Sequence, residues 1–75
     1  MTVSERIKYL RKTLNLTQSD FANKIGLKQA SVGLYENNNR NILDRTIRDI
    51  CREFGVNEKW LRYGIGDIYK FTIRV

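Results

Sequence analysis

Apolar residues recur every three or four positions along most of this chain, which is the spacing that gives an α-helix one buried face. The first stripe predicts a helix over residues 3–13 and consists of Val3, Ile7, Leu10 and Leu14. Similar stripes predict a helix that begins after Thr17 and runs to about residue 25, a helix over residues 29–36, a helix that begins after Asp44 and stops at Gly55, and a short fifth helix between Asn57 and Gly64. The pattern therefore predicts an all-α fold of five helices.

Polar residues at the predicted helix starts fit the role of N-caps, whose side chains accept hydrogen bonds from free backbone amides. Thr2 and Glu5 have the spacing of a capping box. Thr17, Asp44 and Asn57 are expected to cap the second, fourth and fifth helices. The polar segment 37–41, rich in asparagine, is expected to form a loop.

The last seven residues alternate apolar and polar side chains, which is the pattern of a β-strand. We therefore expect a domain over residues 1–66 and a tail over residues 67–75 that allows a short C-terminal β-strand. A single terminal strand has unpaired backbone groups, so it gains most by pairing with its copy in a second subunit. The alternatives are a disordered tail and packing of the tail onto its own helices.

Residues 18–35 carry the pattern of two helices that cross steeply through a very short turn. Apolar residues stand four apart on the first helix and three apart on the second, so the two apolar faces can reach one core. These residues are Phe21 and Ile25, then Val32 and Tyr35. Gly26 falls where the first helix must stop at positive φ, a conformation that costs glycine almost nothing. The second helix is then expected to project outward.

The stretch from Leu16 to Asn38 reads LTQSDFANKIGLKQASVGLYENN. It resembles the helix-turn-helix of the lambda-repressor-like family, the Xre or Cro type of phage and bacterial regulators, and the resemblance extends over roughly residues 4–67. It implies a compact five-helix domain that binds double-stranded operator DNA as a homodimer, with residues 29–36 as the recognition helix in the major groove. It also implies a structural ion pair between Arg11 and Glu36.

The distribution of charge indicates an anionic partner. Residues 6–48 hold nine Lys or Arg residues against three Asp or Glu residues, so this segment carries the whole net charge of +6. A solvated basic surface is the simpler explanation of such a charge. Together with the two-helix pattern, however, the charge favours binding to phosphates.

Four residues of the outward helix are candidates for contacts with DNA bases: Gln29, Ser31, Gly33 and Leu34. Gln29 opens the helix, where a glutamine can present a donor and an acceptor together to adenine. Gly33 costs a helix interior roughly 1 kcal/mol relative to alanine, which a close approach to DNA would explain. Leu34 would either touch a thymine methyl group or cover a contact with a protein.

Six further residues are candidates for contacts with DNA phosphates: Gln18, Lys28, Asn38, Asn39, Arg40 and Arg45. Gln18 begins a helix, where free backbone amides favour an anion, although it is alternatively only a polar first-turn residue. Lys28 places a cation at a helix N-terminus, which is unfavourable unless an anion such as a phosphate lies beside it. The family resemblance places Arg40 in a phosphate-contacting loop, where the asparagines are either further donors or plain turn residues.

The sequence lends little support to an enzyme, a cofactor or a metal site. It has no histidine, and Cys51 lies on a predicted apolar helix face as a reduced core thiol. The carboxylates form no cluster with catalytic or metal-ligand spacing. No apolar run approaches the roughly 20 residues of a membrane span, and the N-terminus lacks a signal peptide, so we expect a cytoplasmic protein.

These observations favour a sequence-specific transcriptional repressor of the phage or mobile-element type. The alternative from another class is a module of the same fold that binds a protein, such as an antitoxin or an antirepressor. Salt-sensitive binding to random duplex DNA separates the two, because only the repressor requires phosphate contacts.

Overall fold

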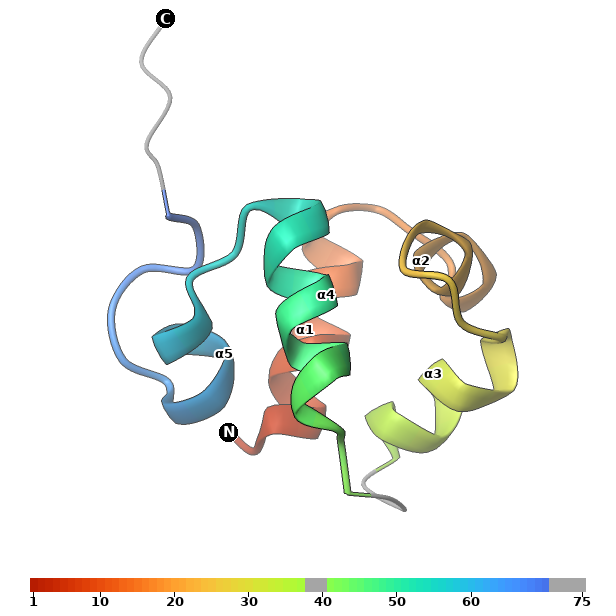
Figure 1. Cartoon of the computed structure of the whole chain (residues 1–75), viewed down its shortest axis with the longest axis horizontal. Coiled ribbons are helices and arrows are strands. Elements are labelled where there is room, and N and C mark those ends of the chain that lie inside the picture. The colour runs from red at the N-terminus through yellow and green to blue at the C-terminus, as the bar shows by residue number, and fades with distance from the viewer. Residues whose placement is uncertain (38–40, 71–75) are drawn as a thin grey trace, which may run out of the picture.

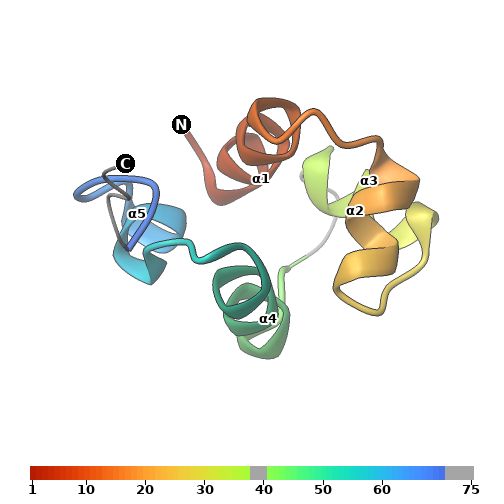
Figure 2. The same cartoon turned by 90° about the horizontal axis from the view of Figure 1, so that it is seen from above.

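A computed structural model of the chain describes residues 1–37 and 41–70. It contains five α-helices, as predicted: α1 (Val3–Thr13), α2 (Gln18–Lys24), α3 (Gln29–Glu36), α4 (Asp44–Phe54) and α5 (Glu58–Tyr63). Helices α2 and α3 lie together at one end of the molecule and α5 lies at the other, with α1 and α4 between them (Figures 1 and 2). Within the described ranges, no helix has the length and apolar character needed to cross a lipid bilayer.

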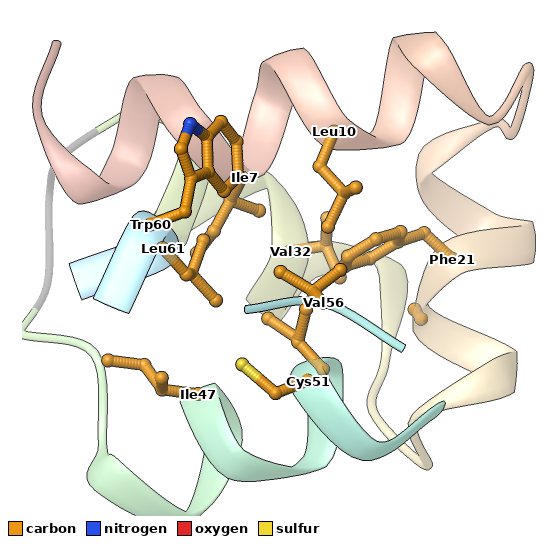
Figure 3. Packing of buried hydrophobic residues seen from close by; sticks show 11 residues of the cluster. Ile7, Leu10, Phe21, Val32, Ile47, Cys51, Val56, Trp60 and Leu61 are labelled. Atoms are coloured by element: carbon orange, nitrogen blue, oxygen red, sulfur yellow. The ribbon is translucent and has the colours of Figure 1, made fainter. Parts of the chain in front are cut away.

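All five helices contribute apolar side chains to one core, in which Leu10, Val56 and Leu61 are fully buried (Figure 3). The ring of Phe21 stacks on that of Phe54 with centroids 5.0 Å apart, and this contact joins α2 to α4. The predicted core residues Ile7, Val32, Ile47, Ile50 and Cys51 are buried in the same cluster. Burial raises the pKa of the Cys51 thiol, in agreement with a core position.

The helix starts follow the predicted caps with one exception. Thr2 and Glu5 form the capping box, and the side chains of Thr17 and Asn57 accept bonds from backbone amides of α2 and α5. The prediction that Asp44 caps α4 is wrong. Asp44 is the first residue inside the helix, and its Oδ1 accepts from Arg62 Nη1 at 2.8 Å. The Asp44 carboxylate thus pairs with α5, and α4 begins without a side-chain cap.

The turn between α2 and α3 has the predicted geometry. Gly26 has φ of 72°, in the left-handed region that favours glycine. The amide of Leu27 then donates to the carbonyl of Ala22 at 2.8 Å, which satisfies one of the free carbonyls at the end of α2. This turn lets α3 start only a few residues after α2 ends.

The segment before the C-terminus pairs with its own chain. Tyr69 forms an isolated antiparallel bridge with Val56, in which the amide of Lys70 donates to the carbonyl of Gly55 at 2.9 Å. The amide of Asn57 donates to the carbonyl of Ile68 at 2.7 Å. Residues 68–70 thus follow one of the predicted alternatives, packing onto their own domain. Residues 71–75, which make up most of the predicted strand, lie outside the described residues.

Candidate nucleic-acid interface

Helix α3 is held to the domain by one face only. Val32, Tyr35 and Glu36 are buried on that face, and Ala22 of α2 is buried against the same core. The small side chain of Ala22 allows the two helices to approach closely. Gln29 and Ala30, the first two residues of α3, are exposed, so the start of the helix is free of the core.

The predicted base-contacting residues differ in how exposed they are. Gln29 is exposed in the first turn of α3, whereas Ser31, Gly33 and Leu34 are each partly buried. Gln29 is therefore the most accessible of the four side chains. Leu34 offers only part of its surface, so neither a thymine methyl group nor a protein would meet a fully exposed leucine here.

The predicted phosphate-contacting residues fall into three groups. Lys28 and Arg45 are exposed, at the N-cap of α3 and near the start of α4. Gln18, the first residue of α2, is partly buried. Asn38, Asn39 and Arg40 lie outside the described residues. The first two groups lie at three helix starts, where backbone amides without intrahelical partners favour anions.

The start of α3 has a particular electrostatic character. Its N-cap residue, Lys28, makes no side-chain capping bond, and its first turn contains no acidic residue. The positive end of the helix dipole and the positive charge of Lys28 therefore lie close together and repel each other. An anion at this position would attract both positive charges.

Arg11 and Glu36 form the ion pair that the family resemblance implied. Arg11 Nε lies 2.6 Å from Glu36 Oε2, and Arg11 Nη2 lies 3.1 Å from Glu36 Oε1. The two side chains are only 12% and 2% exposed. The hydrogen bonds with Glu36 raise the pKa of Arg11. This pair ties the end of α3 to α1, so it helps to fix the angle at which α3 leaves the domain.

The side chain of Gln18 belongs to the same cluster. Its Nε2 donates to Glu36 Oε1 at 3.2 Å, and its carboxamide lies beside Gly33. A Cβ built on Gly33 would be 3.7 Å from Gln18 Oε1, which is an ordinary contact distance. The Gln18 side chain thus lies against α3 and does not extend into solvent.

Arg6 has a structural role that the charge count did not reveal. Its side chain is buried, with Nε donating to the carbonyl of Leu61 at 2.8 Å and Nη2 to that of Arg62 at 2.9 Å. These carbonyls belong to the last turn of α5, so Arg6 caps that helix from α1. One signal was available, because Arg6 follows Val3 by three residues and precedes Leu10 by four, within the apolar stripe.

The helix-turn-helix family matches residues 7–61, a span that includes the whole of α2, the turn and α3. The chain belongs to the helix-turn-helix family. This is the lambda-repressor-like family that the residues of α2 and α3 indicated, and its members are DNA-binding regulators rather than enzymes. Among residues 1–37 and 41–70, no group of three or more His, Cys, Asp or Glu side chains could hold a metal ion.

One relative of this chain is a protein named antitoxin PezA, from Streptococcus pneumoniae serotype 4 (strain ATCC BAA-334 / TIGR4). It is 38% identical over 55 residues, a match that covers 73% of this chain and 35% of PezA. The chain therefore spans about a third of the length of that relative.

A similar solved structure is that of the P22 c2 repressor protein, crystallised in complex with synthetic operator 9T in the presence of Tl⁺. The two structures superpose with a TM-score of 0.79 over 87% of this chain and 98% of that one. Their sequences are 17% identical, so this likeness establishes a shared fold. Helices α2 and α3 of this chain thus belong to a five-helix fold that is shared with the P22 c2 repressor.

Proposed function

We propose that this protein is a cytoplasmic transcription regulator of the phage or mobile-element repressor type. In this proposal it binds an operator as a homodimer and inserts α3, residues 29–36, into the major groove of double-stranded DNA. Bound there, it would block access to a promoter. The family supports DNA binding in general, and the accessible surface of α3 supports the more specific statement.

The observation that carries the proposal is the exposed start of α3. Lys28, Gln29 and Ala30 are all exposed, and the helix end has neither an acidic residue nor a side-chain cap. Gln29 can hydrogen-bond to both N6 and N7 of adenine in the major groove, and Lys28 can pair with a flanking phosphate. A small exposed side chain at Ala30 allows the helix to approach the bases.

Further exposed cations lie on the neighbouring helices α2 and α4. Lys24 near the end of α2, and Arg45 and Arg48 near the start of α4, are exposed. None of the three has a carboxylate within ion-pair distance in the part of the chain that the structure describes. Such cations release counterions when they neutralise phosphates, so they would supply affinity that depends on salt but not on sequence.

Selection of bound sequences from a random duplex pool tests the proposal directly. We expect a palindromic consensus whose half-sites are about one helical turn apart, because two copies of α3 would read equivalent bases on one face of the duplex. The Gln29→Ala variant is the matched control, and it should lose the preference at one base pair of each half-site. Enrichment of no sequence at all would reject sequence-specific binding.

The relation to PezA favours a second candidate function. A chain that is 38% identical to a protein named as an antitoxin could use α3 and the partly exposed Leu34 against a protein partner. The two functions differ in their response to salt, because phosphate contacts weaken steeply as salt rises. Failure to bind random duplex DNA at low salt would favour the protein-binding function over the regulatory one.

A further inference from the structure

Three polar side chains from three helices form one continuous cluster beneath the free side of α3. Arg11 of α1 makes two hydrogen bonds to Glu36 at the end of α3, and Glu36 accepts a third from Gln18 at the start of α2. Arg11 Nη1 also donates to the carbonyl of Leu16 at 2.9 Å, just before the N-cap of α2. The cluster therefore joins α1, α3 and both sides of the start of α2.

The chemistry of Glu36 determines which end of the Gln18 carboxamide faces it. An ionised carboxylate only accepts hydrogen bonds, so Gln18 must turn its NH₂ group, and not its oxygen, toward Glu36. Arg11 also donates two charge-assisted bonds to the same carboxylate. The orientation of the Gln18 carboxamide is thus set by a residue that is itself almost fully buried.

This orientation leaves one N–H group of Gln18 available. A carboxamide nitrogen carries two hydrogens, and Glu36 Oε1 takes one of them at 3.2 Å. Gly33 carries no side chain that could cover the carboxamide, whose Oε1 lies 3.7 Å from the position of a Gly33 Cβ. Among residues 1–37 and 41–70, Glu36 is the one acceptor that Gln18 Nε2 meets, so within these residues the second N–H remains as a donor at the junction of α2 and α3.

We propose that Glu36 is a positioning residue for DNA binding, which holds the Gln18 carboxamide so that its second N–H can donate to a backbone phosphate. This inference rests on the proposed function, in which Gln18 is already a candidate for a phosphate contact, and adds that Glu36 holds Gln18 in place for it. A long side chain that is ordered before binding loses less conformational freedom on binding. The buried pair of Arg11 and Glu36 thus acts on the interface through Gln18, in addition to holding the fold together.

The orientation of Gln18 can be tested first without DNA. The chain has two glutamines, and exposed Gln29 serves as the internal control for partly buried Gln18. In side-chain amide NMR spectra, we expect the Gln18 NH₂ pair to be rigid, with Overhauser contacts to Glu36 and Gly33. The Gln29 pair should be mobile. Equal mobility of the two pairs, or the absence of those contacts, overturns the inference whatever the DNA experiments show.

A double-mutant cycle then tests the effect on DNA binding. Affinity for the selected site is compared for the wild-type chain, Gln18→Ala, Glu36→Gln and the double variant, at a temperature where circular dichroism shows each to be folded. Each single variant should bind about fivefold more weakly, and the double variant about as weakly as Gln18→Ala alone, because residues that act as one unit are not additive.

The outcomes of the cycle separate this inference from the proposed function. If Glu36→Gln weakens binding equally with and without Gln18, Glu36 acts only by holding α3, and the positioning role is overturned while DNA binding stands. Unchanged affinity in Gln18→Ala has the same meaning. If the wild-type chain binds no duplex, the proposed function fails and the assignment of Gln18 to a phosphate fails with it.

Discussion

At the scale of single residues, Gly33 is a position where the fold and the proposed function make different demands. A glycine inside a helix costs about 1 kcal/mol relative to alanine. Gly33 is not among the residues at positive φ, and an added Cβ would meet only the Gln18 carboxamide, at 3.7 Å and 3.9 Å. The packing of the described residues therefore does not require a glycine here, whereas close approach of α3 to DNA would.

We expect Gly33→Ala to raise the free energy of unfolding by about 0.5 to 1 kcal/mol, because it restricts the unfolded chain and improves helix propensity. The same variant should weaken binding to the selected DNA site. Urea denaturation and DNA titration measure the two effects.

Gly55→Ala is the matched control. Gly55 has φ of 65°, so the same substitution should there lower stability by about 1 to 2 kcal/mol. Wild-type DNA affinity in a stabilised Gly33→Ala would remove the functional explanation.

Gln29 and Arg45 should affect DNA binding in different ways. Gln29→Ala should weaken binding chiefly to the cognate site, by about 1 to 3 kcal/mol per half-site, because it removes a base contact. Arg45→Ala should weaken cognate and random DNA about equally and reduce the slope of log affinity against log salt by about one unit. Titrations at several salt concentrations distinguish the two. Equal loss for every sequence in Gln29→Ala would show that this residue does not read a base.

The residues that the sequence did not predict correctly are those whose partners are far away in the chain. Arg6 lies in the apolar stripe of α1, but the carbonyls of Leu61 and Arg62 that it caps are about 55 positions away. Asp44 has the residue type and position of an N-cap, but Arg62 of α5 binds its carboxylate instead. Local spacing contains no information about either partner.

At the scale of helices, the predictions that depended only on local spacing were the most accurate. The bounds of α1 and α3 match the predicted ranges of residues 3–13 and 29–36, and α4 ends directly before the predicted stop at Gly55, although it starts one residue early, at Asp44. Apolar periodicity and glycine stops act within a few residues, so the sequence contains them directly. The placement of the Gln18 side chain across α3 could not be predicted in this way, because it requires the angle between two helices.

The pair that joins α3 to α1 should contribute strongly to stability. Glu36→Ala would leave Arg11, which is 12% exposed, without its carboxylate, and breaking a buried pair in this way costs about 3 to 5 kcal/mol. Asp49→Ala is the control, because it breaks a pair with Arg52, whose side chain is 78% exposed, and should cost under about 1 kcal/mol. An unchanged urea midpoint in Glu36→Ala would contradict the structural role of the pair.

The pair that joins α4 to α5 should make stability depend on pH in acid. A hydrogen bond from Arg62 lowers the pKa of the Asp44 carboxyl below its ordinary value. A carboxyl with a lowered pKa in the folded chain adds stability above its unfolded pKa of about 4, and this stability is lost as pH falls through the folded value. We therefore expect the urea midpoint of Asp44→Asn to fall less steeply than that of the wild-type chain below about pH 4. Parallel curves would show that the pair does not contribute to folding.

At the scale of the whole molecule, the candidate interface and the C-terminal segment are far apart. Helices α2 and α3 form one end, and residues 67–70 lie beside α5 at the other end (Figure 1). Contacts made by residues 67–70 therefore do not compete with contacts made by α3. A homodimer that joins two chains through their tails would leave both copies of α3 free.

The length of the tail provides the test of this arrangement. A chain that ends at Lys70 keeps the backbone bonds of Ile68 and Lys70 to Asn57 and Gly55, so its stability should stay within about 0.5 kcal/mol of the full chain. A chain that ends at Asp67 loses both bonds, each worth about 1 kcal/mol. It also loses the contact of Ile68 with the core, and should be clearly less stable.

Sedimentation of the same chains then examines the dimer itself. If the alternating residues 69–75 pair between subunits, the chain that ends at Lys70 should be monomeric at concentrations where the full chain is dimeric, although both are equally well folded. The shortened chain should then bind single half-sites and lose the gain in affinity that a second linked half-site provides. Identical concentration dependence in the two chains would place the dimer contact elsewhere, on surfaces that residues 1–70 supply.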